Sequence, residues 1–159
     1  MDVVAKSKLS FVAKRTLSFV AKRTLSFDLG TQQNLVGLSS TRRPWQVAWF
    51  LNEHFSTEFM RIPDWVSGLS AEALSFTCFR WTSDQEIPLA YLLKNTSPLG
   101  SISPTLRDAC DYLLIYSDEA PLPEASLLAP QLHQHQYFGF VMALAPDDKR
   151  WSRHIPIFF

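Results

Sequence analysis

The stretch DYLLIYS (residues 111–117) decides the fold that this sequence predicts. It is an apolar run, in part β-branched and aromatic, that follows a polar segment after Pro104 and leads into the turn sequence DEAP (118–121). A short apolar run between turn signals is typical of a strand that is buried on both faces. We therefore expect the rest of the chain to cover this strand from two sides.

Length and composition favour one folded domain in a reducing compartment. The chain has 159 residues, of which 47% are hydrophobic, with 12 Phe and 5 Trp, and a disordered chain lacks such aromatic content. No apolar run approaches the roughly 20 residues that cross a bilayer, and no signal-peptide pattern is found. Cys78 and Cys110 stand singly in apolar contexts, which favours buried free thiols over a disulfide. We expect a cytoplasmic protein without a membrane span.

The N-terminus holds three copies of one octapeptide: VAKSKLSF (4–11), VAKRTLSF (12–19) and VAKRTLSF (20–27). Such short, similar copies indicate a recent duplication and not a solenoid repeat. Residues 1–27 carry six Lys or Arg against one Asp, a net +5, so the rest of this neutral chain carries −5. We predict that residues 1–23 are a frayed or loosely paired tail and that 24–159 form one domain. As an alternative, the tail is a transit peptide or an arm for an anionic surface.

Hydrophobic periodicity and turn residues divide the domain into strands and helices. The expected strands are 24–29 together with 35–38, then 57–62, 74–81, 88–94, 111–117 and 137–144, and the expected helices are 45–55 and 124–129. Long runs of strands with few crossover helices favour an antiparallel sheet with its helices on one face. The predicted class is α+β, a mainly antiparallel sheet with two helices in the order β-α-β-β-β-β-α-β.

Particular residues are expected to begin, end and orient these elements. Ser39, Ser40 or Thr41 would cap the first helix. Pro63 would end the strand 57–62, and Pro130 would end the second helix. The inward-facing stripe would be Val47, Trp49, Phe50, Leu51 and Phe55 in the first helix, and Leu127 and Leu128 in the second.

Three blocks of the chain carry a family resemblance: LSFDLG (25–30) with LVGLSS (35–40), WQVAWFLNEHFSTEFMRIPDW (45–65), and the step from Ile102 and Pro104 into Asp111-Tyr112 and LLIY (113–116). Through these blocks residues 24–159 resemble the IPExxxVDY family of small bacterial proteins. The naming motif departs from the family pattern, because Pro104 stands one residue too far from Asp111. Thr105 also takes the Glu position and Cys110 the Val position. The resemblance implies no assigned activity, and Thr105 cannot serve as a general acid or base.

His133 and His135 in QLHQHQ are the nearest approach to a metal-binding pair. Two His residues at i and i+2 share a face only on a strand, and zinc takes at least three protein ligands. A third ligand would have to come from a residue such as Cys110, Asp111 or His154. The simpler interpretation is that polar His residues follow a helix C-terminus, where the helix dipole favours them.

Asp111 and Tyr112, at the start of the central run, complete the set of binding candidates. A carboxylate that begins an apolar strand is either hydrogen-bonded or exposed. We expect Asp111 to cap a turn or to pair with Arg107, a structural role. The aromatic pairs Trp45/Trp49 and Phe55/Phe59 would suit a stacking platform for single-stranded nucleic acid, but we interpret them as core residues.

No nucleophile elbow, phosphate-binding glycine loop or HExxH motif occurs, so no catalytic residue, metal or cofactor is assigned. We therefore expect a non-enzymatic protein-interaction module that acts as a homodimer or with a protein partner, because interfaces draw on aromatic residues. One alternative is a metal-dependent or small-ligand-binding protein that uses His133, His135 and Asp111. The other is a basic tail that binds nucleic acid or an anionic surface.

Overall fold

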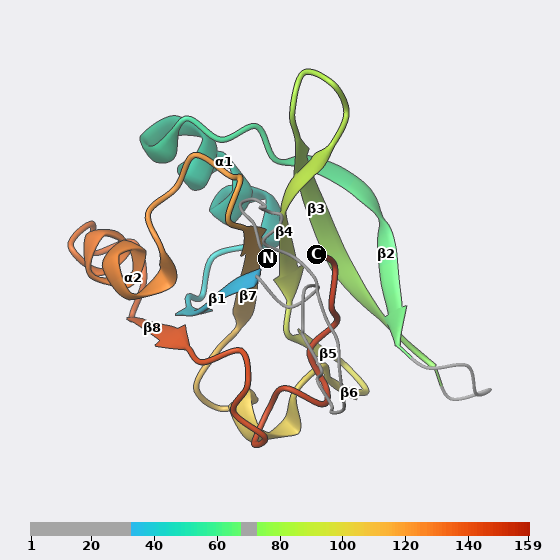
Figure 1. Cartoon of the computed structure of the whole chain (residues 1–159). Helices are drawn as coiled ribbons and strands as arrows, with labels where there is room; N and C mark the ends of the chain where they lie inside the picture. Colours follow the sequence, from blue (N-terminus) through green and yellow to red (C-terminus); the bar gives the residue numbers. More distant parts are fainter. Residues whose placement is uncertain (1–32, 68–72) are drawn as a thin grey trace, which may run out of the picture. The chain divides into compact units, whose positions relative to one another are not determined.

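The computed structural model describes residues 33–67 and 73–159. The expected tail 1–23 and the expected strand 24–29 lie outside these residues. In chain order the elements are β1 (Gln33–Ser39), α1 (Pro44–Phe55), β2 (Met60–Ser67), β3 (Leu74–Thr82), β4 (Pro88–Lys94), β5 (Thr96–Ser97), β6 (Gly100–Ser101), the 3-10 helix η2 (Pro104–Leu106), β7 (Tyr112–Ser117), α2 (Ala125–His133) and β8 (Phe140–Leu144) (Figure 1).

Six strands form one sheet in the order β2-β3-β4-β7-β1-β8, and every neighbouring pair is antiparallel. The short strands β5 and β6 form a separate hairpin. The predicted α+β class is confirmed. With the small hairpin set aside, the elements also follow the expected order β-α-β-β-β-β-α-β.

Strand β7 is buried on both faces, as its sequence predicts. Tyr112, Leu114 and Tyr116 project to the side where α1 and α2 pack, which we call the helix face. Leu113 and Ile115 project to the opposite side. Side chains on a strand alternate between the two faces of a sheet, so one run of five buried residues contributes to two cores.

The two faces of the sheet are covered by different parts of the chain. On the helix face, α1 and α2 contribute buried side chains to a core that includes Phe79 and Trp81 of β3. On the opposite face the cover comes from the segment before β7 and from the C-terminal segment. The buried residues of this second cover are Ile102, Leu106, Cys110, Trp151 and Ile155. Cys78 and Cys110 are buried free thiols, as expected.

Helix α1 begins differently from the prediction. Its N-cap is Arg43, so capping by Ser39, Ser40 or Thr41 is wrong. The side-chain carbonyl of Gln46 accepts the Arg43 N–H (2.9 Å), one half of a capping box. Pro44 occupies the first turn. A backbone N–H in that turn has no hydrogen-bond partner within the helix, so proline, which lacks the N–H, is tolerated there.

Two residues expected in the core lie outside it. Trp49 of α1 is 54% exposed, and Leu127 of α2 is 58% exposed. A helix turns about 100° per residue, so the arc that buries Val47, Ala48 and Leu51 places Trp49 on the outer side. The neighbour Leu128 is buried as expected.

Both prolines expected to end an element lie inside one. β2 continues through Pro63, with an irregular register between Ile62 and Trp65. This is tolerated because β2 is an edge strand, where a missing N–H breaks no second ladder. α2 continues through Pro130 to His133. Within the residues described, neither helix is long and apolar enough to cross a membrane.

Candidate functional site

Asp111 and Tyr112 hold the loop between β1 and α1. The Asp111 carboxylate accepts the Ser40 N–H (2.8 Å), and the Asp111 N–H donates to the Leu38 carbonyl (2.7 Å). The Tyr112 hydroxyl donates to the Arg42 carbonyl. Asp111 therefore stabilises a turn through backbone contacts, and its partner is Ser40 and not Arg107.

Tyr112 also contacts the only lysine of the described strands. Its ring lies in the core, 5.0 Å from the Lys94 ammonium, because Lys94 and Tyr112 are register partners of β4 and β7. Burial, reinforced by the nearby Asp111 charge, raises the pKa of Tyr112 to about 12. The phenol therefore stays protonated near neutral pH and remains a hydrogen-bond donor.

His133 ends α2, and His135 follows two residues later. His135 packs in an aromatic cluster between α1 and the loop before β8, with ring centroids 5.3 Å from Phe50 and 5.0 Å from His54. His133 is the exposed last residue of α2. In residues 33–67 and 73–159 no three His, Cys, Asp or Glu side chains gather as metal ligands. The metal alternative therefore finds no ligand set in this part of the chain.

The outer face of α1 carries two exposed indoles that the sequence placed in the core. Trp45 is 61% exposed and Trp49 is 54% exposed, and a spacing of four residues puts both on one helix face. The core interpretation is wrong for this pair and right for Phe59, which is buried. A helical wheel centred on Val47 and Leu51 would have found them, because it assigns Trp45 and Trp49 to the outer side.

A hollow opens beside Trp45, where the first turn of α1 meets strands β2 and β3. It encloses about 310 Å³, and its lining residues are Pro44, Trp45, Arg61, Thr77 and Phe79. We call it the Trp45 hollow. The Arg61 guanidinium lies over the Phe79 ring, 5.9 Å from the centroid, and pairs with Asp64 at 2.8 Å. The hollow thus joins apolar rings to a cation, a combination that binds aromatic or apolar side chains.

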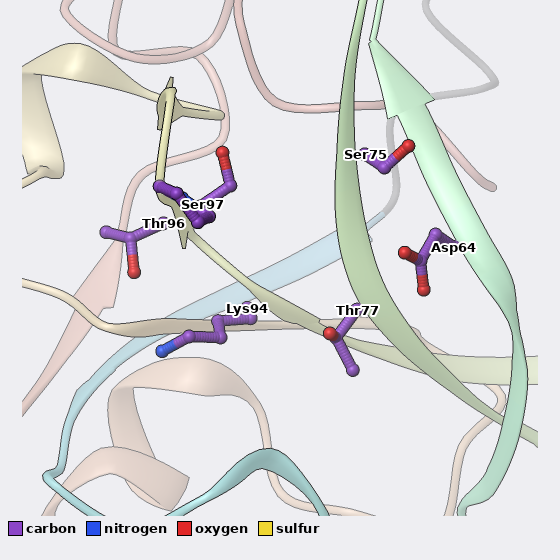
Figure 2. Close-up of a pocket in the computed structure, with 7 residues that line it drawn as sticks. Asp64, Ser75, Thr77, Lys94, Thr96 and Ser97 are labelled. Atoms are coloured by element: carbon purple, nitrogen blue, oxygen red, sulfur yellow. The ribbon is translucent and has the colours of Figure 1, made fainter.

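A second, polar hollow adjoins the first at Thr77. It encloses about 520 Å³, and its lining residues are Asp64, Ser75, Thr77, Lys94, Thr96, Ser97 and Pro98. We call it the Lys94 hollow. Figure 2 shows Lys94, Thr96 and Ser97 at one end and Asp64, Ser75 and Thr77 at the other. Neither hollow contains Asp111, Tyr112, His133 or His135.

Three comparisons with known proteins return no match to this chain: none among protein families, none among curated proteins and none among solved structures. The resemblance to the IPExxxVDY family and the bacterial origin that it implies stay predictions. The two hollows and the exposed indoles are the features of the molecule from which a function can be inferred.

Proposed function

We propose that this chain is a non-enzymatic protein-interaction module, and that its contact surface is the outer face of α1 with the Trp45 hollow. The observation that carries the proposal is the exposure of Trp45 and Trp49 side by side on one helix face. Trp and Arg are the residues that most often dominate the binding energy of protein interfaces. Here Arg61 lies in the hollow that opens beside Trp45.

The partner that this surface fits is a second copy of the chain. Arg43, the exposed N-cap residue of α1, and Glu53, an exposed residue near the C-terminal end of α1, carry opposite charges. A two-fold interface brings the same patch of both copies together and needs such self-complementarity. When two α1 helices cross antiparallel, Arg43 approaches Glu53 of the second copy, and Trp49 approaches the second copy's Trp45 hollow.

The expected affinity is modest. A buried aromatic side chain removes about 150–250 Å² from water, so four half-exposed indoles supply roughly 400 Å² of new burial. At about 25 cal/mol per Å² this is about 10 kcal/mol, set against an association entropy of about 4–15 kcal/mol. The two figures are similar, so the dimer should form and dissociate with protein concentration.

The test is the molar mass of the full chain, measured by size-exclusion chromatography with light scattering over a dilution series. We expect a dimer at high concentration, and a monomer throughout for the double variant Trp45→Ala, Trp49→Ala. Met60→Ala is the matched control: Met60 is also exposed, but neighbouring strand residues alternate, so it points away from the face that carries Arg61. A wild-type chain that stays monomeric, or a double variant that still dimerises, would overturn the proposal.

A further inference from the structure

The Lys94 hollow contains a cation without a carboxylate partner in the part of the chain that the structure describes. The ion pairs among the described residues are Arg61 with Asp64 and Arg150 with Asp148. Lys94 is half-buried, and its ammonium lies over the Tyr112 ring, 5.0 Å from the centroid. An ammonium group donates charge-assisted hydrogen bonds to an anion, and these are stronger than hydrogen bonds between neutral groups.

Four residues with hydroxyl groups line the same hollow: Ser75, Thr77, Thr96 and Ser97. Ser97 uses its hydroxyl within the β5–β6 turn, where it accepts the Leu99 N–H (3.3 Å) and donates to the Gly100 carbonyl (3.4 Å). The hydroxyls of Ser75, Thr77 and Thr96 form no hydrogen bond with any other residue described here. Each can donate one hydrogen bond and accept others, so all three can serve a ligand.

The far end of the hollow favours neutral polar groups over a second anion. One carboxylate oxygen of Asp64 accepts from Arg61 (2.8 Å), which leaves the other as an acceptor. The lining contains no aromatic side chain, so an aromatic base would find no stacking partner. Hydroxyl groups of a ligand would find Asp64, Ser75 and Thr77 there.

We propose that the Lys94 hollow binds a sugar phosphate, that is, a phosphate ester of a small polyhydroxylated molecule. The phosphate lies at the end of Lys94 and Thr96, and the sugar hydroxyls face Asp64, Ser75 and Thr77 (Figure 2). A volume of about 520 Å³ falls within the usual range of small-molecule sites, about 300–1,000 Å³. The site contains neither Trp45 nor Trp49, so it stands independently of the interface proposed above.

Isothermal titration calorimetry of the full chain tests this site with three probes: a hexose 6-phosphate, the free hexose and inorganic phosphate. We expect the hexose phosphate to bind more tightly than either fragment. Lys94→Met keeps the apolar stem and should weaken hexose phosphate binding by about tenfold or more, the effect of one charged hydrogen bond. The double variant Ser75→Ala, Thr77→Ala should lower the affinity for the hexose phosphate and leave the affinity for inorganic phosphate unchanged.

The control is Lys149→Met, which removes an exposed lysine outside the hollow and should leave binding unchanged. If the Lys94→Met variant does not fold, the Thr96→Val variant is used in its place and should also bind the hexose phosphate more weakly than the wild type does. The site is refuted if the wild-type chain binds no hexose phosphate, or if the folded Lys94 or Thr96 variant binds it as tightly as the wild type does. Equal affinity for inorganic phosphate would refute the sugar subsite, and equal affinity for free hexose would refute the phosphate subsite.

Discussion

Tyr112 connects three parts of the molecule through one side chain. Its ring is buried in the core of the helix face, its hydroxyl donates to the Arg42 carbonyl, and Lys94 lies over the ring. The same loop is held by Asp111, which accepts from Ser40, 71 residues earlier in the chain. The sequence predicted that Asp111 would be hydrogen-bonded in a turn. It could not predict the partner, because only the antiparallel pairing of β1 and β7 brings the two residues together.

We predict that Tyr112→Phe lowers the free energy of unfolding by about 1–3 kcal/mol, because it leaves the part-buried Arg42 carbonyl without its donor. Tyr91→Phe is the control: Tyr91 packs flat on Phe158 and its hydroxyl bonds to no other described residue, so its loss should change stability by less than about 0.5 kcal/mol. Urea unfolding of both variants measures the difference. Equal stability losses would show that the Arg42 contact contributes nothing.

Gly37 lies in the middle of β1, where a larger side chain has no room. A Cβ atom there would meet Cys110 Sγ closer than van der Waals contact allows. We predict that Gly37→Ala lowers the free energy of unfolding by about 1–3 kcal/mol through overpacking. Cys110→Ala removes the clashing sulfur, so the double variant should lose less than the sum of the two single losses. Additive losses in a double-mutant cycle would contradict this.

Among the elements, the helices show where sequence periodicity succeeds and where it fails. The existence of α1 and α2 follows from the spacing of their apolar residues. The outward direction of Trp49 and Leu127 does not follow from that spacing. A broad apolar stripe is compatible with several choices of buried face, and only packing against the sheet selects one of them. The hollows are also beyond sequence reasoning, since their linings come from α1 and from strands distant along the chain.

Pro130 in the interior of α2 gives a prediction at this scale. Alanine there would restore the N–H that can donate to the Ser126 carbonyl, and a helix-interior proline costs about 3 kcal/mol. Proline also restricts the unfolded chain, which is worth about 0.4–1 kcal/mol in the opposite direction. We therefore expect Pro130→Ala to raise stability by about 1–2 kcal/mol in urea unfolding. Pro146→Ala, in an exposed turn, should not raise it.

At the scale of the whole molecule, the burial of titratable side chains on both faces of the sheet makes the free energy of unfolding depend on pH. Burial raises the pKa of Cys78 and of Cys110 from 9.0 to about 11 and also raises the pKa of Tyr116. These groups are neutral when protonated, so the contribution of the two thiols to stability is complete below their unfolded pKa of 9.0. The contribution is lost as the pH rises through the folded pKa.

We predict a fall in the free energy of unfolding between pH 9 and 11. At about 1.4 kcal/mol per pH unit for each group, the two thiols alone remove on the order of 5 kcal/mol, comparable with the total stability of many domains. Urea unfolding at pH 7, 8, 9 and 10 measures the slope, and Cys78→Ala with Cys110→Ala should flatten it. A constant free energy up to pH 10 would show that these thiols ionise as freely in the fold as in the unfolded chain.

The antiparallel contact of two α1 helices is the claim on which the proposed function depends, and a charge-swap experiment tests it most directly. Arg43→Glu and Glu53→Lys should each weaken self-association, because each places like charges opposite one another in a two-fold pair. In a mixed pair, both contacts between positions 43 and 53 again join opposite charges, because the glutamate introduced in one variant faces the lysine introduced in the other. Sedimentation equilibrium should therefore find an equimolar mixture associating more tightly than either variant alone. A mixture no tighter than its components would contradict the antiparallel interface.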